Sequence, residues 1–497
     1  MRALSKSKIL ASLQCHKRLW LEVHRPSFRK DSAATQAGFA SGDQVGEIAR
    51  NLYQTKGSGT LIDWKSEGFS AGFARTLEAM QRGGPVFEAG FQCEGALSLA
   101  DVLLPVEVDG GRAWRMVEVK SSTSIKDYHL ADAAIQSYVA RSAGVPLVAS
   151  ALARVDSSWT YPGDGDYQGL LVEKDVTEQT LSREREVRGW IAAAQRTVAE
   201  PSEPKRRTGK HCNDPYECGF LKYCQGQEPQ ADSPVYWLPR RTGKLKQYIE
   251  KNGITEMRDV PDQLLNPTQQ RVKTATLSGE PFFDREGAAR ALSQHSLPAY
   301  FMDFETIMFA VPIWAGTRPY QQIPFQFSVH RMQKSCELEH REFLDLSGND
   351  PSGPFASALV AACGKQGPIF VYNASFETAR LRELAARFPD MADDLLALNE
   401  RVVDLLPIAQ SHYYHASQKG SWSIKAVLPA LCGQSYEKLD GVKDGGMAMA
   451  AYLEALGAST TPARRLEIDR QLREYCCMDT MAMVRIFESI SAVDSRS

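Results

Sequence analysis

The sequence lacks an apolar run long enough to cross a bilayer, and its first residues, "MRALSKSKILASLQC", lack the apolar core of a secretion signal. We therefore expect a cytoplasmic protein without a membrane partner. In that reducing compartment the ten cysteines are not expected to form disulfides. Clustered thiols in this chain therefore indicate a metal ion or an iron–sulfur cluster.

An excess of one charge is also absent, because the formal net charge is −2 over 497 residues. This balance excludes a histone-like protein that binds nucleic acid through overall positive charge, but it does not exclude a nuclease, whose acidic metal ligands offset a basic groove. The sequence has no internal repeat and no G-x-x-x-x-G-K-[ST] motif. Any helicase or ATPase that acts with it must therefore be a separate chain.

The length corresponds to roughly two to four domains. Residues 226–296 are rich in Pro, Gly and polar residues, and they are predicted to form a helical connector between domains at 1–225 and 297–497. A simple linker is the plain alternative to a connector whose basic residues line a groove. Strand-like and helix-like segments alternate on both sides of the connector, including a strand at 115–122 and a helix at 127–144. Both domains are therefore expected to be α/β.

The segment "GKHCNDPYECGFLKYC" contains three cysteines, Cys212, Cys218 and Cys224, with five residues between neighbours. Three thiols in one short loop with Gly, Pro and Asn are a poor match to buried free cysteines. A tetrahedral metal or cluster site takes four ligands, so a fourth is expected elsewhere in the chain.

A first group of catalytic residue types lies in the N-terminal half. Asp101 belongs to the apolar run "LADVLLP", and Glu118 and Lys120 share one face of the strand "MVEVKSS". Two carboxylates can hold Mg²⁺ or Mn²⁺, which activates water for phosphodiester hydrolysis, while a lysine stabilises the developing charge. The alternative is a surface strand with a charged pair, because the pattern alone is weakly specific.

A second group lies in the C-terminal half. Asp303 and Glu305 share one face of the strand "AYFMDFET", and Glu377 opens the helix "FETARLRELAARF". Tyr475 and Asp479 lie one turn apart on the helix "REYCCMDTMAMVRIFE". Acidic side chains on an apolar strand are costly unless they are paired or bind metal. The four carboxylates therefore suit a two-metal site for phosphoryl transfer, with Tyr475 to orient the attacking water.

Residues 5–225 resemble the RecB/AddB-like branch of the PD-(D/E)XK nucleases, which includes CRISPR-associated iron–sulfur exonucleases. The resemblance implies a restriction-endonuclease-like fold in which Asp101, Glu118 and Lys120 bind metal and catalyse. It also implies that Gln136, in the helix that follows, supports the site. Many relatives have a metal-binding His in an upstream helix, and Glu47 is the nearest candidate here for that ligand.

In the same family, one N-terminal cysteine and three cysteines after the nuclease core hold a [4Fe–4S] cluster. The resemblance therefore implies that Cys15 completes the set with Cys212, Cys218 and Cys224. Zinc is the alternative, because four thiolates suit it as well. A structural role is expected, since such a clip couples ligand binding to folding.

Residues 297–490 resemble the DEDD exonucleases of the RNase H-like fold, in the DnaQ-like tyrosine subclass. The resemblance implies metal binding by the four carboxylates and 3′→5′ polarity. Glu377 stands where this family normally has Asp, and Asp404 in "VVDLLPI" is expected to be structural. The alternative is a domain that has lost catalysis and only grips nucleic acid.

Together these motifs predict an enzyme with two nuclease sites that hydrolyses DNA, at single strands or ends, in DNA repair or defence. Both sites are expected to use Mg²⁺ or Mn²⁺. Two alternatives stay open from the sequence. One is an RNA-processing 3′→5′ exonuclease, since nothing in the sequence shows what distinguishes a 2′-OH. The other is a docking module that binds nucleic acid and contains one inactive nuclease domain.

Overall fold

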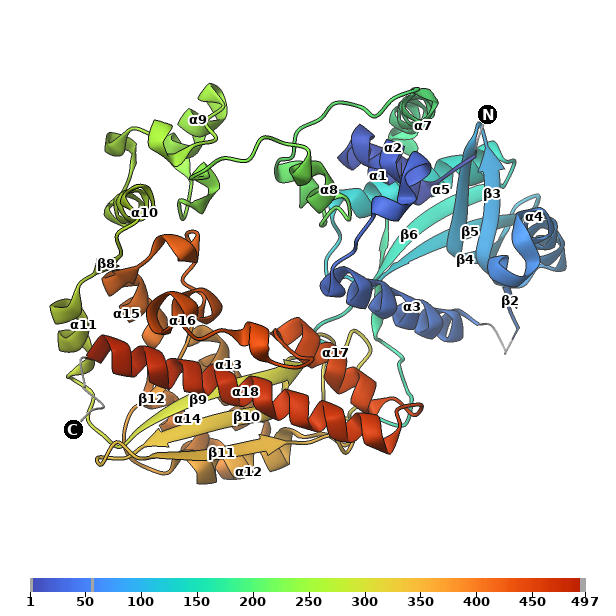
Figure 1. Ribbon diagram of the computed structural model, residues 1–497. Helices are drawn as coiled ribbons and strands as arrows, with labels where there is room; N and C mark the ends of the chain where they lie inside the picture. Colours follow the sequence, from blue (N-terminus) through green and yellow to red (C-terminus); the bar gives the residue numbers. More distant parts are fainter. Residues whose placement is uncertain (1–2, 55–57, 492–497) are drawn as a thin grey trace. The chain divides into compact units, whose positions relative to one another are not determined.

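The computed structural model describes residues 3–54 and 58–491, and its mixed α/β character confirms the predicted class (Figure 1). The chain forms two compact units. The first contains Met1–Pro229 and Met308–Gln321, and the second contains Gln230–Ile307 and Gln322–Ser497.

A mixed sheet forms the centre of the first unit. Its strands are β1 (Leu4–Ser5), β2 (Thr60–Leu61), β3 (Val86–Cys93), β4 (Ala96–Val108), β5 (Gly111–Lys120), β6 (Leu147–Val155) and β7 (Leu171–Asp175). Within the described residues the order is β2-β3-β4-β5-β6-β7, with β1 paired to β4. Strands β4 and β5 are antiparallel, whereas β5 and β6 are parallel. The predicted strand at 115–122 is confirmed as part of β5.

Helices pack around this sheet. They are α1 (Lys6–Gln14), α2 (His16–His24), η1 (Pro26–Phe28), α3 (Ala33–Tyr53), α4 (Trp64–Arg82), α5 (Asp127–Ser142), α6 (Thr177–Ser182), α7 (Glu184–Ala199), η2 (Lys210–Cys212) and α8 (Leu221–Gly226). The predicted helix at 127–144 is confirmed as α5, which connects the parallel strands β5 and β6. Its Ile135 and Val139 are fully buried in one apolar cluster with Leu103 and Met116 of the sheet. Helix α5 is therefore held firmly beside β4 and β5.

The second unit contains another mixed sheet. Its strands are β9 (Ala299–Ile307), β10 (Ile323–Met332), β11 (Leu338–Leu344), β12 (Ile369–Val371) and β13 (Val402–Asp404), and a separate pair consists of β8 (Phe282–Phe283) and β14 (Tyr413–Tyr414). The order is β11-β10-β9-β12-β13, so β9 is central. It is antiparallel to β10 and parallel to β12. The predicted strand "AYFMDFET" is confirmed as part of β9.

The helices of the second unit are η3 (Val235–Trp237), α9 (Gly243–Asn252), η4 (Met257–Asp259), η5 (Asp262–Leu264), α10 (Pro267–Ser278), α11 (Arg285–Leu292), α12 (Ser352–Cys363), α13 (Ser375–Arg387), η6 (Pro389–Met391), α14 (Ala392–Glu400), α15 (Leu405–His412), η7 (Ala416–Gln418), α16 (Ile424–Cys432), η8 (Tyr436–Lys438), α17 (Gly445–Leu456) and α18 (Pro462–Ser491). Figure 1 shows α18 running along the sheet of β9 and β10.

Side-chain alternation along β9 sorts its residues between two faces of the sheet. Met302 and Phe304 join an apolar cluster with residues of α12, α13 and α14. Phe301 packs against Phe487 of α18 on the opposite face. Asp303 and Glu305 have the same parity as Phe301, so both carboxylates point to the α18 side.

Two segments are grouped differently from the predicted arrangement of two domains and a connector. Residues 230–296 belong to the second unit and contain α9, α10 and α11. Helix α9 ends at Gly253, whose φ of 61° is the left-handed conformation that favours glycine. Residues 308–321, between β9 and β10, belong to the first unit, where Tyr161 exchanges backbone hydrogen bonds with Gly316 and Thr317.

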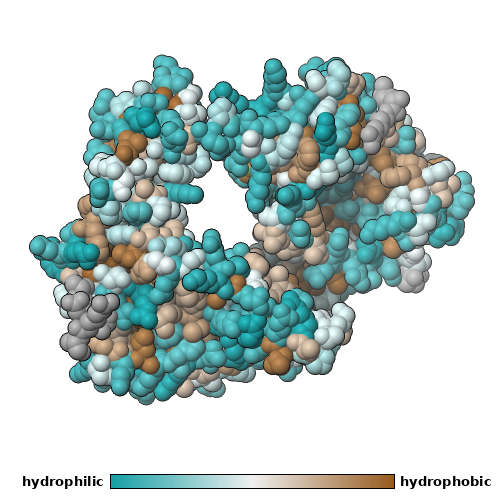
Figure 2. Space-filling view, viewed as in Figure 1, coloured by the Kyte–Doolittle hydropathy of each residue, from teal (hydrophilic) through white to brown (hydrophobic). Residues whose placement is uncertain are grey.

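Hydrophilic residues cover most of the visible surface of each unit, and hydrophobic residues form smaller patches between them (Figure 2). Within the described part of the chain, no helix combines the length and the apolar character that a membrane crossing requires.

Candidate functional site

The first candidate site lies on β4 and β5. Val102 pairs with Val117, so Asp101 stands opposite Glu118 in the antiparallel register. Glu118 is only 1% exposed. Asp101 accepts a 2.7 Å hydrogen bond through Oδ2 from the amide of Val119. The structure thus brings together the two carboxylates that the sequence predicted to act together.

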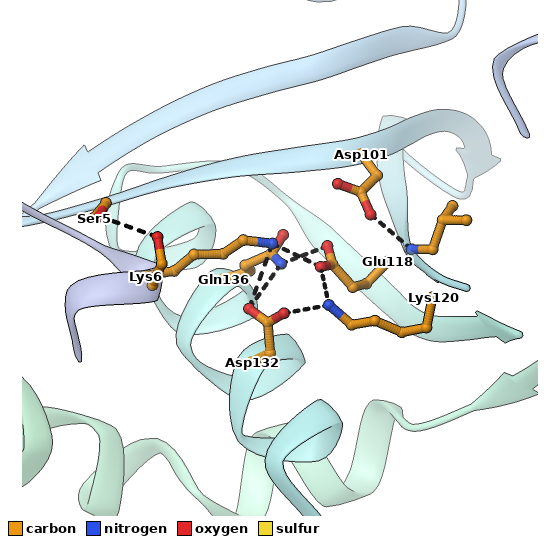
Figure 3. A network of polar contacts seen from close by, with 9 residues as sticks. Ser5, Lys6, Asp101, Glu118, Lys120, Asp132 and Gln136 are labelled. Atoms are coloured by element: carbon orange, nitrogen blue, oxygen red, sulfur yellow. Dashed lines mark hydrogen bonds and ion pairs between the residues drawn. The ribbon is translucent and has the colours of Figure 1, made fainter. Parts of the chain in front are cut away.

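Two lysines converge on the carboxylate of Glu118 (Figure 3). The Nζ atoms of Lys6 and Lys120 each lie 2.6 Å from Glu118 Oε1. Both lysines also pair with Asp132, Lys6 at 3.4 Å from Oδ1 and Lys120 through Oδ2. Burial disfavours their charge, but the attraction of Asp132 and Glu118 outweighs it and raises the pKa of both lysines. Both ammonium groups are therefore held in the charged form.

Gln136, which the sequence predicted to support the site, contacts two of its carboxylates. Its Nε2 donates to Glu118 Oε2 and, at 3.3 Å, to Asp132 Oδ1. Its Oε1 is buried without a hydrogen-bond partner among the described residues. A buried acceptor without a donor is costly, so this atom is a position that a water molecule or a substrate group would satisfy.

The electrostatics of this site suit a cation. Burial, with repulsion from Asp101, raises the pKa of Glu118 to about 8 despite the two lysines. Burial also raises the pKa of Asp101. Although burial opposes ionisation of Asp132 as well, Lys120 and Lys6 lower its pKa. The two lysines therefore do not supply enough positive charge to keep both Asp101 and Glu118 ionised, and a bound cation would supply the rest.

A further carboxylate, Glu88 of β3, belongs to this neighbourhood. Its neighbours Phe87 and Ala89 pair with Val102 and Ala100, so Glu88 stands opposite Asp101. Burial raises the pKa of Glu88, and Lys6 opposes that shift. Its φ of 57° lies in the left-handed region, which is costly for a residue with a side chain and is frequent at functional positions.

Glu47, the predicted substitute for a metal-binding histidine, lies on the exposed face of α3. Helical spacing places it on the same face as Asp43 and Arg50, both of which influence the charge of Glu88. Among the described residues, however, no hydrogen bond or ion pair joins Glu47 to Glu118 or Asp101. The structure therefore places Glu47 near the site's side of α3 but outside its network of contacts.

The four predicted cluster cysteines line one pocket of the first unit. Cys15 lies between α1 and α2, Cys212 ends η2, Cys224 belongs to α8, and Cys218 donates its backbone amide to Cys212 O at 2.8 Å. Cys15, Cys212 and Cys218 are buried, and Cys224 is half-buried. The chain therefore closes a long loop, from Cys15 to the 212–224 segment, at this pocket.

The surroundings of these thiols fit a bound metal centre. Burial raises the pKa of Cys218, and it raises that of Cys224 to about 11, so a metal is needed to convert both thiols to thiolates near neutral pH. The basic residues Lys17, Arg18, Arg206 and Arg207 line the same pocket and would offset the negative charge of four thiolates.

The sulfur atoms of the four cysteines are not gathered as tightly as the ligands of a bound zinc ion. Zn–S bonds of about 2.3 Å place the sulfurs of a zinc site within about 4 Å of one another. Among the described residues, no three of these four cysteines have their sulfur atoms all within 4.8 Å of one another.

The second candidate site lies where β9 faces α18. The carboxylates of Asp303, Glu305 and Asp479 have oxygen atoms within 4.8 Å of one another. Glu305 is 7% exposed and Asp479 is 6% exposed. Three close carboxylates with so little access to water are unfavourable unless they share protons or bind cations.

Their pKa values express this conflict. Burial, with repulsion from Asp479 and Glu305, raises the pKa of Asp303 far above its usual range. Burial and Asp479 raise the pKa of Glu305 to about 8, and burial also raises the pKa of Asp479. Without a metal ion the cluster is therefore partly protonated at neutral pH, and a divalent cation would compete with those protons.

Glu377 of α13 stands beside this group and not within its tightest part. It is 2% exposed, and it contributes to the raised pKa of Asp303. Its Oε2 is buried without a hydrogen-bond partner among the described residues. Burial raises the pKa of Glu377 to about 8. Glu377 is therefore suited to be a fourth oxygen ligand, because a bound cation would give its buried Oε2 a partner.

Tyr475 and two neighbours complete the site. Lys425 Nζ donates a 3.0 Å hydrogen bond to the hydroxyl of Tyr475, and its charge partly opposes the rise in the pKa values of Asp303, Glu305 and Asp479. The hydroxyl of Tyr436 donates a 2.6 Å hydrogen bond to Asp479 Oδ1. Asp404 has a structural position instead, because its carboxylate accepts hydrogen bonds from backbone amides at the starts of α13 and α15.

Sequence reasoning missed five residues of these two sites, namely Lys6, Glu88, Asp132, Lys425 and Tyr436. Asp132 was detectable as an acid in the otherwise apolar stretch "ADAAIQSY", one turn before Gln136. The others lie in segments without a local signal. Lys6, for example, contacts a partner 112 residues away.

A comparison with protein families finds a match to part of the chain. Residues 300–423 match a family described as "Domain of unknown function (DUF2779)". The matched segment contains Asp303, Glu305 and Glu377, and it ends before Tyr475 and Asp479. No curated protein matches the chain. The comparisons therefore relate the second unit in part to a family whose function is not described.

Proposed function

We propose that this protein is a metal-dependent nuclease that hydrolyses DNA at two sites, one in each unit. The observation that carries the proposal is the convergence of Asp303, Glu305 and Asp479 within 4.8 Å, with Glu305 and Asp479 buried and Asp303 half-buried. Buried carboxylates so close together are the arrangement that holds divalent cations for phosphoryl transfer. Glu377 and Tyr475, from two further segments, stand beside them.

The second unit is proposed to be an RNase H-like exonuclease domain of the DEDD tyrosine subclass, with 3′→5′ polarity. The order of the motifs and their positions on a central strand, a helix start and the long helix α18 support this proposal. When bound, Mg²⁺ or Mn²⁺ would activate water and neutralise charge on the phosphate. Tyr475 would orient the attacking water, and Lys425 would hold its hydroxyl in place.

The first unit is proposed to be a PD-(D/E)XK nuclease domain of the RecB/AddB-like branch. Asp101 and Glu118 from adjacent antiparallel strands would hold the cation, with Glu88 as an additional carboxylate. Lys120 would stabilise charge on the phosphate or position the water. Lys6 brings a second ammonium group to the same carboxylate and would share this role.

The four cysteines are proposed to hold a [4Fe–4S] cluster with a structural role. The convergence of four thiols on one pocket with a basic lining supports a bound metal centre, and the family resemblance favours a cluster over a single zinc ion. Cysteines that bind a cluster must stay reduced, as they do in the cytoplasm, and we propose the cytoplasm as the location of this protein. Repair of DNA or defence against foreign DNA is the proposed setting.

The full chain is tested with a labelled single strand of DNA and an RNA of the same sequence, in Mg²⁺, in Mn²⁺ and with a chelator. The proposal predicts metal-dependent shortening of the DNA. Cleavage of the RNA alone would contradict the proposal and would indicate an RNA-processing nuclease. Tight binding of both strands without any metal-dependent cleavage would contradict the proposal and would indicate a docking module that binds nucleic acid.

A further inference from the structure

A second group of metal-ligating side chains lies in the second unit, outside the proposed nuclease site. It consists of His330 of β10, His340 of β11 and Cys477 of α18, whose ligand atoms lie within 4.8 Å of one another. The two histidines are direct partners in the antiparallel register of β10 and β11. Their rings stack with centroids 4.5 Å apart. Three separate elements therefore converge on one small space.

Two hydroxyl groups orient the two imidazole rings. His330 Nδ1 lies 2.8 Å from Thr480 Oγ1, and His340 Nε2 lies 2.9 Å from Ser328 Oγ. The two hydroxyls bond to each other at 2.7 Å and are fully buried. Each ring thus has one nitrogen held by a hydroxyl group, and two nitrogens per ring give each histidine a further donor for a ligand. Metal-binding histidines are commonly fixed by a second hydrogen bond of this kind.

The charge state of the group also suits a metal. Burial, with His340 nearby, lowers the pKa of His330 to about 4, and partial desolvation of the His340 ring lowers its pKa as well. Both rings are therefore neutral and offer lone pairs at neutral pH. Arg485 lies near His330, but its guanidinium pairs with Glu488 at 2.8 Å.

We propose that His330, His340 and Cys477 bind a borderline-soft divalent cation of the zinc class. Two imidazoles and one thiolate suit Zn²⁺, and they do not suit Mg²⁺, which prefers oxygen ligands. His340 is exposed and Cys477 is half-buried, so the ion can reach the site from solvent. The fourth ligand would be either a water molecule or Glu342. Glu342 lies on the same face of β11 as His340 and pairs with Arg473.

The site would connect the β10–β11 hairpin to α18, the helix that also carries Tyr475 and Asp479. Cys477 points to a different side of α18 from Cys476, whose Sγ contacts Asp303 O. A bound ion would therefore brace the helix from the side away from the carboxylates. The proposal does not depend on nuclease activity, since it concerns ligands that take no part in the proposed chemistry.

The test is a Zn²⁺ titration of the full chain in excess Mg²⁺, which occupies carboxylate sites. We compare wild type with His340→Ala and Cys477→Ser, and we use Cys336→Ser, in the exposed turn of the same hairpin, and His415→Ala as matched controls. Any metal held by the four cysteines of the first unit is common to all variants. The proposal predicts that His340→Ala and Cys477→Ser each lose one equivalent of tightly bound Zn²⁺, and that the controls lose none.

Co²⁺ serves as a second, spectroscopic probe. Wild type and Cys336→Ser are expected to show thiolate-to-Co²⁺ absorption that is weaker in Cys477→Ser by the contribution of one thiolate. Thermal unfolding without metal checks that each variant is folded, and Zn²⁺ should raise the melting temperature of wild type more than that of His340→Ala. Equal Zn²⁺ binding by wild type, His340→Ala and Cys477→Ser would overturn the proposal.

Discussion

The hydroxyl of Tyr436 donates a hydrogen bond of 2.6 Å to Asp479, the carboxylate contributed by α18 to the second site. Tyr475, one turn earlier in the same helix, also interacts with Asp479 and in addition accepts a 3.0 Å hydrogen bond from Lys425. The two tyrosines therefore share Asp479, and Tyr475 alone of the two accepts a hydrogen bond from Lys425. We infer that Tyr436 positions a metal ligand, whereas Tyr475 positions the attacking water.

Replacing these tyrosines should separate the two roles. Tyr436→Phe frees the carboxylate of Asp479 and is expected to weaken Mg²⁺ binding about 10-fold, with little change in kcat at saturating Mg²⁺. Tyr475→Phe is expected to lower kcat about 10²-fold, with a smaller loss of Mg²⁺ affinity than Tyr436→Phe. The measurement is the rate of DNA cleavage as a function of Mg²⁺ concentration. Tyr452→Phe is the control, because the Tyr452 hydroxyl is buried without a partner among the described residues.

Lys6 should be as important to the first site as Lys120. Both ammonium groups lie 2.6 Å from the same oxygen of Glu118. Lys6→Met keeps the length of the side chain and removes its charge, so we expect cleavage by the first site to fall about 10²-fold. Lys8→Met, in the same helix, is the matched control. The measurement uses the Asp303→Asn background, in which the second site is silent. Equal rates for the two methionine variants would contradict the role of Lys6.

The second site should make stability depend on pH and on metal. Burial and Asp479 raise the pKa of Glu305 from an ordinary 4.5 to about 8 in the folded protein. Between these values the folded state keeps a proton that the unfolded state has released. The stability of the metal-free protein therefore falls as pH rises through this window. Mg²⁺ binds the ionised form, so its stabilising effect should grow over the same window.

Thermal unfolding with and without Mg²⁺, at about pH 6 and about pH 8, measures this effect. We expect Mg²⁺ to raise the melting temperature by several degrees more at the higher pH. Glu305→Gln should show a smaller loss of stability with pH, whereas Glu400→Gln, at the exposed end of α14, should behave like wild type. A Mg²⁺ effect that is equal at both pH values in wild type would argue against a carboxylate cluster that exchanges protons for metal.

The cysteine pocket should control the folding of the first unit. Cys218→Ser removes one of four ligands, so purified protein is expected to lose the colour and iron content of a [4Fe–4S] cluster and to unfold at a lower temperature. Cys93→Ser, a half-buried cysteine of the same unit, is the control. Metal analysis and thermal unfolding are the measurements. Zinc in place of iron in fresh wild type would identify the alternative metal, and an unchanged, fully active Cys218→Ser variant would contradict a structural site.

Local patterns predicted the elements that carry most of the candidate site. The alternation in "AYFMDFET" placed Asp303 and Glu305 on one face of β9, and the spacing in "REYCCMDTM" placed Tyr475 and Asp479 on one face of α18. Strand and helix periods are local properties, so they can be recognised without knowledge of the tertiary structure. The same reasoning located β5 and α5 around Glu118.

Contacts between distant segments were not predictable in this way. Lys6 opens α1 and resembles a surface lysine in sequence, yet it reaches Glu118 across 112 residues. Lys425 meets Tyr475 across 50 residues. The segment 308–321 follows β9 directly, but it packs with the first unit. These arrangements depend on how elements pack, for which a single sequence holds no periodic signal.

The most direct test of two nuclease sites is cleavage of end-labelled DNA by wild type, Asp101→Asn, Asp303→Asn and the double variant. Asparagine at position 101 can still accept the hydrogen bond from the amide of Val119, so each change removes charge and preserves shape. The account predicts that each single variant loses a different part of the products and that the double variant cleaves no more than wild type with a chelator. Unchanged products from the double variant would contradict it.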